Sequence, residues 1–232
     1  MDIHIYQLLE GAKQAKGLAV VIDVFRAFSL ACYAINNGAK EIIPIDDIEK
    51  AYELKKQHPE YILIGERNER IPPGFDYGNS PTHILNVDFT GKTLVHSTSA
   101  GTRGLINASG AYERLTGSFV NAPAVVSYIK QKNPQTVSLV CMGYSANYPT
   151  EEDTFCAEYI KNSLEEKAVD YQEMMNIIKD TSGKRLFNPE NSEHSPQSDF
   201  YLCTDLGRFD FILKAETDSS GLLKLKKLIE NR

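Results

Sequence analysis

Polar and charged side chains follow four apolar runs of the sequence, at the point where each run ends. The run "VVID" ends at Asp23 and is followed by Arg26, and "LIGE" ends at Glu66 and is followed by Arg67. The run "TLVH" is followed by "STSAGTR", and "LVCMG" by "YSANYPTEED". In open α/β sheets, ligands bind beyond the carboxyl ends of the strands. We therefore expect these segments to face one common site.

The segment "HSTSAGTRG", residues 96–104, has the composition of an anion-binding loop. Small residues let the backbone approach a ligand closely, and N–H groups at the start of a following helix favour an anion. Hydroxyl groups and an arginine add hydrogen-bond donors. Ordinary N-capping of the helix is the alternative interpretation. The candidate binding residues are Thr98, Ser99, Ala100, Gly101, Thr102 and Arg103.

Carboxylates at these positions indicate a metal site. Asp23 closes an apolar run, where an unpaired charge is costly, so it needs a metal, a hydrogen-bond donor or Arg26 as partner. Oxygen ligands without nearby His or Cys suit Mg²⁺ rather than zinc. The acids of "EED" also complement the dipole of the helix that they begin. The predicted ligands are Asp23, Glu66, Glu152 and Asp153.

The charge balance indicates the kind of ligand. The net charge is −6 and the pI is near 5.4, whereas a protein that coats nucleic acid needs a dense basic face. Several arginines gathered beyond one sheet edge would instead suit a small, multiply charged anion. The arginines that follow predicted strands are Arg26, Arg67, Arg70 and Arg103.

Strand-like and helix-like segments alternate along the chain, which predicts an α/β fold. We expect three layers, α/β/α, around a mixed, largely parallel sheet, in a single domain of residues 1–232 that could divide into two related halves near 1–115 and 116–232. Residues 181–199 are predicted to form a long loop or lid, residues 199–216 one or two strands, and residues 220–232 a short helix. The predicted strands are 18–24, 41–45, 61–66, 92–98 and 136–143.

The sequence also indicates a compartment. The first residues lack the apolar core of a signal peptide, and no apolar run approaches the length of a membrane span. The four cysteines form no C-x-x-C pair, so reduced thiols in a cytoplasmic protein without membrane contact are expected. These cysteines are Cys32, Cys141, Cys156 and Cys203.

Five segments, in this order and spacing, resemble the 2-phosphosulfolactate phosphatases: "VVIDVFRAFSLA", "GERNERIPPGFDYGNSP", "HSTSAGTRGL", "EEDTFCAEYI" and "CTDLGRFDFI". The resemblance covers roughly residues 1–215. It implies an Mg²⁺-dependent phosphatase that releases phosphate from 2-phospho-3-sulfolactate and leaves 3-sulfolactate, a step of coenzyme M biosynthesis. The chain departs from the family at Ala100, where an amide side chain is common, and at Glu69, where a small residue is usual.

The resemblance also implies roles for individual residues. Mg²⁺ would bridge the phosphate and the carboxylates, and Arg26 and Arg67 would neutralise the remaining charges. Asp76 is the candidate general acid or base. Asn79 and Ser80 are expected to face the anion, although turn formation or helix capping also explains this loop.

The attacking group and the function class each have an alternative. The nucleophile is water or Asp23, and water is favoured because Phe25 stands where an aspartyl-phosphatase motif has a second acid. A phosphatase for another small phosphate ester and a non-catalytic anion-binding module are the alternative functions. Carboxylates close to the bound anion favour the enzyme over the non-catalytic binding module. A homodimer is the expected assembly.

Overall fold

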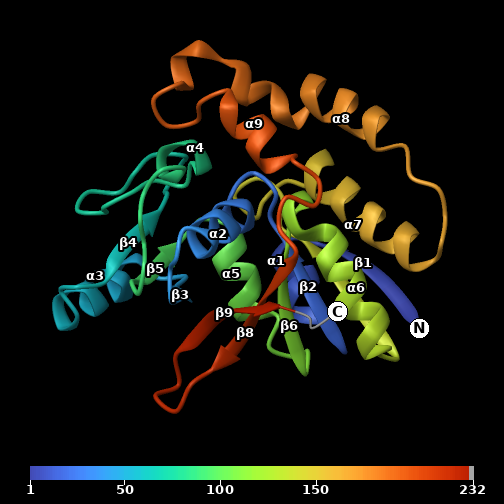
Figure 1. Cartoon of the computed structure of the whole chain (residues 1–232), viewed down its shortest axis with the longest axis horizontal. Coiled ribbons are helices and arrows are strands. Elements are labelled where there is room, and N and C mark those ends of the chain that lie inside the picture. Colours follow the sequence, from blue (N-terminus) through green and yellow to red (C-terminus); the bar gives the residue numbers. More distant parts are fainter. Residues whose placement is uncertain (230–232) are drawn as a thin grey trace.

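The computed structural model describes residues 1–229, which form one mixed nine-stranded sheet with helices on both faces (Figure 1). The strand order is β1-β7-β2-β6-β8-β9-β3-β5-β4. The predicted α/β fold with a mixed, largely parallel sheet is confirmed, while the division into two related halves stays a prediction. The strands are β1 (Asp2–Gln7), β2 (Leu18–Ile22), β3 (Glu41–Pro44), β4 (Ile62–Gly65), β5 (Thr93–Ser97), β6 (Glu113–Gly117), β7 (Thr136–Cys141), β8 (Phe211–Thr217) and β9 (Leu223–Ile229).

Two parallel blocks are joined by an antiparallel hairpin. Strands β1, β7, β2 and β6 form one block, and β3, β5 and β4 form the other. The β8–β9 hairpin lies between them and meets β3 at a single residue pair, Ile42 with Leu225. Because β6–β8, β8–β9 and β9–β3 all pair antiparallel, the two parallel blocks run in opposite directions within the sheet. Residues that follow strands of both blocks nevertheless line one pocket.

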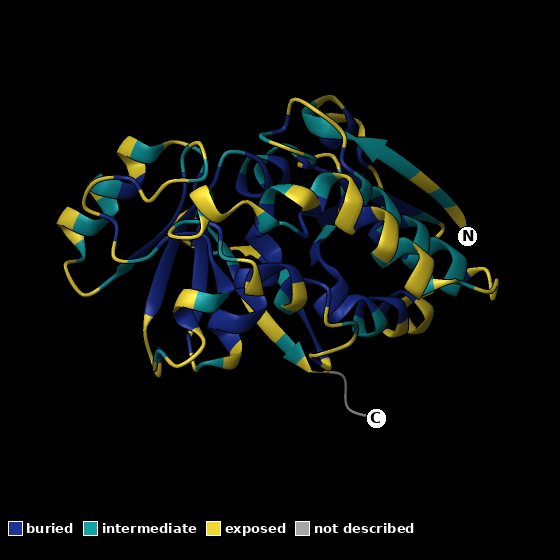
Figure 2. Ribbon diagram, turned by 90° about the horizontal axis from the view of Figure 1, so that it is seen from above, coloured by how far each residue is buried: buried dark blue, intermediate teal, exposed yellow. Residues whose placement is uncertain are grey.

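The sheet is buried because helices cover both faces (Figure 2). In β2, Val21 packs into one core cluster and Val20 into the other, as the two-residue period of a strand requires. Helices α1 (Leu8–Gln14), α2 (Ala27–Asn36) and α5 (Gly101–Asn107) contribute to the first cluster. Helices α6 (Ala122–Lys132), α7 (Glu151–Leu164) and α8 (Tyr171–Asp180) contribute to the second. Helix α3 (Ile48–Gln57) packs on β3, β4 and β5.

The C-terminal third differs from the sequence prediction. Residues 181–199 are not a loop: they contain the 3₁₀ helices η2 (Ser182–Phe187) and η3 (Pro189–Asn191), and they lead into α9 (Ser198–Cys203). Residues 223–229 form a strand rather than a helix, because Leu and Lys alternate over residues 223–226 with a two-residue period and the whole segment pairs with β8. Residues 230–232 of that predicted helix lie outside the described part. The remaining short elements are α4 (Pro81–Ile84) and η1 (Phe119–Asn121).

None of the helices within residues 1–229 combines the length and the apolar character needed to cross a membrane.

Candidate active site

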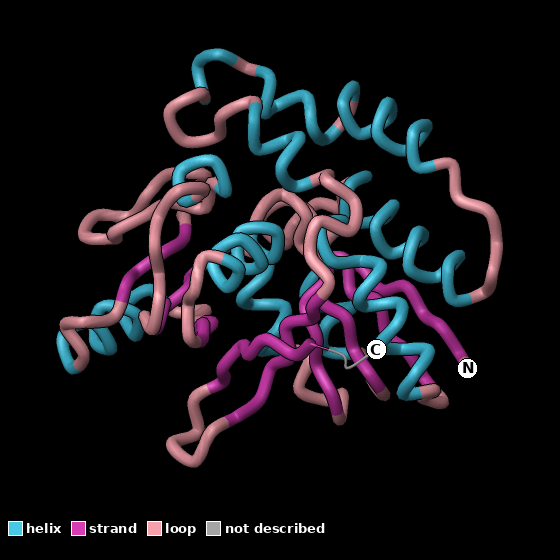
Figure 3. The backbone as a smooth tube through the Cα atoms, in the orientation of Figure 1, coloured by secondary structure: helices cyan, strands magenta, loops and turns pink. Residues whose placement is uncertain are grey.

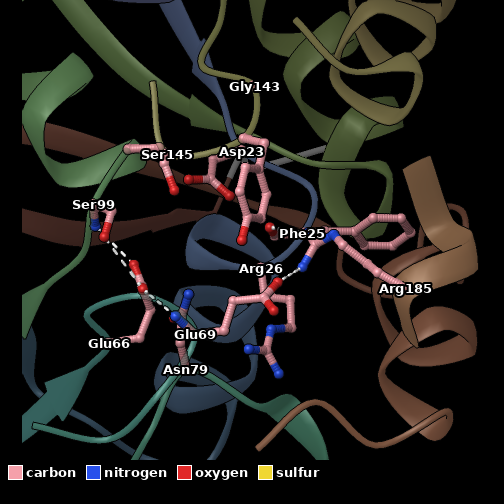
Figure 4. A pocket seen from close by; sticks show the side chains of 12 residues that line it. Asp23, Phe25, Arg26, Glu66, Glu69, Asn79, Ser99, Gly143, Ser145 and Arg185 are labelled. Carbon is pink, nitrogen blue, oxygen red and sulfur yellow. Dashed lines mark hydrogen bonds and ion pairs between the residues drawn. The ribbon is translucent and has the colours of Figure 1, made fainter. Parts of the chain in front are cut away.

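One pocket collects residues from all four polar segments that follow the strands, together with residues of the 181–199 segment (Figure 4). Figure 3 shows that segment as short helical turns and loops that run past the strand ends. The predicted site residues that line the pocket are Asp23, Arg26, Glu66, Asn79, Ser99 and Ala100. The pocket residues that the sequence analysis did not select are Phe25, Glu69, Gly143, Tyr144, Ser145 and Arg185.

Asp23 follows β2 and is the most perturbed acid that lines the pocket. Its side chain is buried, and its Oδ1 accepts the N–H of Ala27 at 3.0 Å. The pKa of Asp23 is raised to about 7, chiefly by burial and also by the negative charges of Glu66 and Glu152. The carboxyl group is therefore close to half ionised near neutral pH. A cation bound beside it would favour the charged form.

Gly101 allows the start of α5 to approach Asp23. A Cβ atom at this position would lie 2.7 Å from Oδ2 of Asp23 and 2.9 Å from Cβ of Ala27. Both are closer than ordinary contacts of a Cβ atom, so either the Asp23 carboxyl group must rotate away or α2 must shift. The absence of a side chain at position 101 is thus a condition for the position of the Asp23 carboxyl group.

We expect Gly101→Ala to lower kcat by about tenfold to a hundredfold, because small misplacements of a reacting group cost that much. Gly104→Ala is the matched control, since its added Cβ would crowd the flexible side chain of Met142 and not Asp23. Steady-state kinetics and thermal unfolding of both variants check this. A similar loss of kcat in both would show that crowding of α5, rather than displacement of Asp23, is responsible.

The loop before α5 binds the carboxylates of the site itself. The N–H of Ser99 donates to Oε1 of Glu66 at 2.7 Å, and the N–H of Gly101 lowers the pKa of Asp23. Thr98 and Thr102 are buried outside the pocket, where the Thr98 hydroxyl accepts the N–H of Thr102 at 3.2 Å. Hydrogen bonds between Thr98 and Thr102 within this turn occupy both threonines, and neither lies in the pocket, so we do not retain them as ligand-binding residues.

The predicted arginines are engaged elsewhere. Arg26 is buried and pairs with Asp199, not Asp23, at 2.7 Å between Nη1 and Oδ2. Arg67 donates to the carbonyl groups of residues 46 and 66 and to Oγ of Ser97, because these acceptors replace water around its half-buried guanidinium. Arg103 donates to the carbonyl of residue 99 within its own helix turn. Neither Arg67 nor Arg103 lines the pocket, and Arg70 is exposed outside it.

Asp76 and Ser80 also lie outside the pocket. Oδ2 of Asp76 accepts the N–H of Leu63 at 2.8 Å and contacts Lys55 at 3.3 Å. Ser80 donates to Oδ1 of Asp199 at 2.8 Å. Asp76 thus fixes its loop to β4, and its position gives no support to the expected acid–base role.

Asn79, in the same loop, does line the pocket and is oriented by a buried histidine. Nε2 of His96 lies 3.1 Å from Oδ1 of Asn79. Burial, together with Arg67, lowers the pKa of His96 to about 3, so the ring is neutral near pH 7. A neutral ring that donates from Nε2 leaves the amide N–H groups of Asn79 available to an anion.

Arg185 supplies the cationic group that the sequence analysis missed. Its guanidinium pairs with Glu69 and donates to the carbonyl of Phe25 at 3.2 Å (Figure 4). It lies 5.2 Å from the ring centre of Tyr144 and 5.9 Å from that of Phe25, within the range of cation–π attraction. The composition of residues 181–199 carried no signal for this role, because the contacts arise from packing between distant segments.

The predicted magnesium ligands are only partly suited to a metal. Asp153 accepts the N–H groups of Val24, Met142 and Gly143, and Glu66 is likewise occupied by backbone donors. Glu152 is buried and its Oε2 has no hydrogen-bond partner.

Within residues 1–229 no three acidic, His or Cys side chains are arranged as a metal-ligand group. Asp23 lines the pocket, and Glu152 is buried near it but does not line it. Glu66 also lines the pocket, but both of its carboxylate oxygens accept backbone N–H groups. Asp23 and Glu152 are therefore the carboxylates that would hold Mg²⁺, which typically keeps several water ligands. The four-carboxylate set expected from the sequence is therefore not assembled.

Comparisons with known proteins place the chain in a family. A family model described as 2-phosphosulpholactate phosphatase matches residues 3–217. A probable 2-phosphosulfolactate phosphatase of Bacillus subtilis (strain 168) is 32% identical over 222 residues, which is 94% of this chain and 95% of the relative. A protein of the same name from Caldicellulosiruptor saccharolyticus is 43% identical over 145 residues, 61% of this chain and 60% of the relative. One from Thermotoga petrophila is 40% identical over 143 residues, 62% and 61% of the two chains.

The fold, the pocket and these matches define the class of protein as a phosphate monoester hydrolase built on an α/β sheet. The chain belongs to the 2-phosphosulpholactate phosphatase family. The resemblance in the sequence is thereby confirmed, and the family match favours an enzyme over a non-catalytic anion-binding module.

Proposed function

We propose that this protein hydrolyses 2-phospho-3-sulfolactate to 3-sulfolactate and phosphate with the help of Mg²⁺. The observation that carries the proposal is one pocket that contains both a carboxyl group with a pKa raised to about 7, Asp23, and a guanidinium group, Arg185. The family match and the names of the relatives support the choice of substrate. That substrate bears phosphate, sulfonate and carboxylate groups, so it needs both cationic and N–H donors.

Different residues of the pocket interact with different groups of the substrate. Arg185 and the amide of Asn79 supply donors to the acidic groups of the substrate. Asp23 is placed beside the phosphate group of the substrate, where its negative charge can bind a cation. In the reaction, the oxygen of a water molecule forms the new bond to phosphorus. The bond from phosphorus to the C2 oxygen breaks, one proton of the water passes to this oxygen to form the hydroxyl group of 3-sulfolactate, and the other stays on the released phosphate.

Magnesium is the proposed cofactor, held by Asp23 and Glu152. When bound, it neutralises negative charge on the phosphoryl oxygens. The unpartnered Oε2 of Glu152 and the raised pKa of Asp23 support this choice. Burial disfavours the ionised form of both carboxyl groups, Arg185 offsets part of the charge of Glu152, and a bound cation would favour both ionised forms.

We expect phosphate release from 2-phospho-3-sulfolactate to be lost in EDTA and restored by excess Mg²⁺. Calcium is the matched control, because it carries the same charge but prefers longer bonds and more ligands. Mg²⁺ should also raise the melting temperature at pH 8, where Asp23 is ionised. Full activity in EDTA would contradict the metal requirement. Release from other phosphate esters but not from this one would contradict the substrate.

We also propose that the reaction is a step of coenzyme M biosynthesis. The protein is proposed to be cytoplasmic and to assemble as a homodimer. Four buried free cysteines are compatible with a reducing compartment. Size-exclusion chromatography with light scattering tests the dimer.

A further inference from the structure

Arg185 differs from the other arginine of the pocket in having a pocket carboxylate as its partner. Arg26 also lines the pocket, but its buried guanidinium is committed to Asp199 and to the carbonyl of His194. Arg185 instead pairs with Glu69, and both side chains retain about a fifth of their exposure, 21% and 23%. The pair can therefore open towards solvent without unfolding its surroundings.

Glu69 is held in this position by an unfavourable turn. Residues 67 and 70 form an isolated antiparallel bridge, with hydrogen bonds of 3.0 and 3.1 Å in both directions. The two residues between them, Asn68 and Glu69, have φ values of 53° and 64°. Such a turn prefers glycine at its second position, and a larger residue there carries a conformational cost that often marks a functional site. The N–H of Glu69 donates to Oε2 of Glu66 at 2.9 Å, which fixes the turn to the pocket.

We propose that Glu69 is an internal anion that occupies Arg185 until a second acidic group of the substrate, a carboxylate or a sulfonate, displaces it. The inference rests on the proposed function, which supplies a substrate with such groups beside its phosphate. The guanidinium keeps its place when Glu69 leaves, because the carbonyl of Phe25 and the rings of Phe25 and Tyr144 still hold it.

This arrangement makes the pair a determinant of specificity. A ligand with a single acidic group competes poorly for Arg185, because the carboxylate of Glu69 is already held beside the guanidinium. A substrate already anchored by its phosphate presents its second acid at a high effective concentration. Glu69 therefore selects for ligands with two anionic groups over single anions, at the expense of some affinity for the correct ligand.

The test measures binding rather than turnover, by isothermal titration of the product 3-sulfolactate at pH 8 and constant ionic strength. We expect Glu69→Gln to bind it about fivefold more tightly, as the loss of a partly exposed ion pair implies. Arg185→Met should bind it at least about tenfold more weakly, since charged hydrogen bonds are lost. In the double variant the effect of Glu69→Gln should vanish if Glu69 acts by occupying Arg185. Glu69 also lines the pocket, so a gain that persists without Arg185 would show direct charge repulsion instead and would contradict the competition.

Two controls sharpen the result. Glu190→Gln removes a negative charge from an adjacent cavity that Glu69 also lines, so it reports on long-range charge alone and should leave binding unchanged. Isethionate and lactate carry only a sulfonate or only a carboxylate, and the one whose binding tightens in Glu69→Gln identifies the displacing group. Circular dichroism and thermal unfolding establish that each variant is folded.

Unchanged or weaker binding of 3-sulfolactate by folded Glu69→Gln would overturn the inference, because Glu69 would then not compete for Arg185. That outcome leaves the proposed function intact. A different result would contradict the proposed substrate alone. Wild type would then release no phosphate from 2-phospho-3-sulfolactate, while Glu69→Gln would still bind 3-sulfolactate more tightly, so that the competition between Glu69 and the ligand for Arg185 would stand.

Discussion

Asp23→Asn is expected to lower phosphate release from 2-phospho-3-sulfolactate by about a thousandfold or more. Asparagine has the same size, and its Oδ1 can still accept the N–H of Ala27, so the strand end keeps its structure. The loss follows because the variant cannot provide the negative charge that the proposed mechanism places at the phosphoryl end. Single-turnover phosphate release at saturating Mg²⁺ measures the chemical step directly.

The same variant should be more stable than wild type at high pH. The pKa of Asp23 is about 7 in the folded chain, against 3.8 for an unperturbed group. A raised pKa favours the protonated folded form, so this contribution to stability is complete below pH 4 and is lost as the pH rises through 7. Asparagine cannot ionise, and Asp23→Asn should therefore gain about 2–4 kcal/mol of unfolding free energy over wild type at pH 8, and little at pH 4.

Urea unfolding in EDTA at both pH values measures this difference. Mg²⁺ should reduce it at pH 8, because the cation stabilises the ionised wild type. Equal stability of the two proteins at pH 8 would show that Asp23 does not carry an uncompensated charge.

Asp199→Ala is expected to destabilise the protein by about 3–5 kcal/mol, the range for removing one partner of a buried ion pair. Asp199 is fully buried and Arg26 is 2% exposed. Asp199 also accepts hydrogen bonds from Ser80 and from the N–H and hydroxyl of Thr82, between 2.7 and 3.0 Å. The variant leaves a buried guanidinium and three donors without their acceptor.

Loss of Asp199 should also impair the pocket, because it connects α9 both to Arg26 and to the loop of Asn79. We expect kcat/KM to fall at least about tenfold through misplacement of these groups. Asp205→Ala is the matched control: its contact with Arg208 is 3.7 Å long and exposed, so its removal should cost less than about 1 kcal/mol. Comparable denaturation midpoints for the two variants would contradict the structural role of Asp199.

Sequence patterns could predict the positions that strand topology determines. Asp23, Glu66 and Ser99 each follow an apolar run, and residues at the carboxyl ends of strands are where ligands bind in α/β sheets. The parallel strands β4 and β5 bring Glu66 and Ser99 together, and Asp23 joins them from β2 of the other block. The pattern of apolar residues therefore predicted both the sheet and the approximate location of the pocket. In the same way, alternating Leu and Lys over residues 223–226 indicated the start of a strand, which the helical interpretation overlooked.

The remaining site residues depend on contacts that no local pattern records. Arg185 meets Glu69 across 116 positions of sequence, and Asp199 meets Arg26 across 173. Asp76 and Asn79 share one turn-rich loop, yet only Asn79 reaches the pocket, because the carboxylate of Asp76 caps the N–H of Leu63. The direction of side chains in such a loop follows from packing, so composition alone could not distinguish Asp76 from Asn79 as a pocket residue.

The central claim is that the pocket around Asp23 hydrolyses 2-phospho-3-sulfolactate. Its most direct test is phosphate release from this substrate by wild type, Asp23→Asn and Asp76→Asn under identical conditions with Mg²⁺. We predict that wild type and Asp76→Asn release phosphate at similar rates, since Asp76 lies outside the pocket, and that Asp23→Asn is nearly inactive. Retained activity in folded Asp23→Asn, or a loss confined to Asp76→Asn, would contradict the assignment of this pocket as the active site.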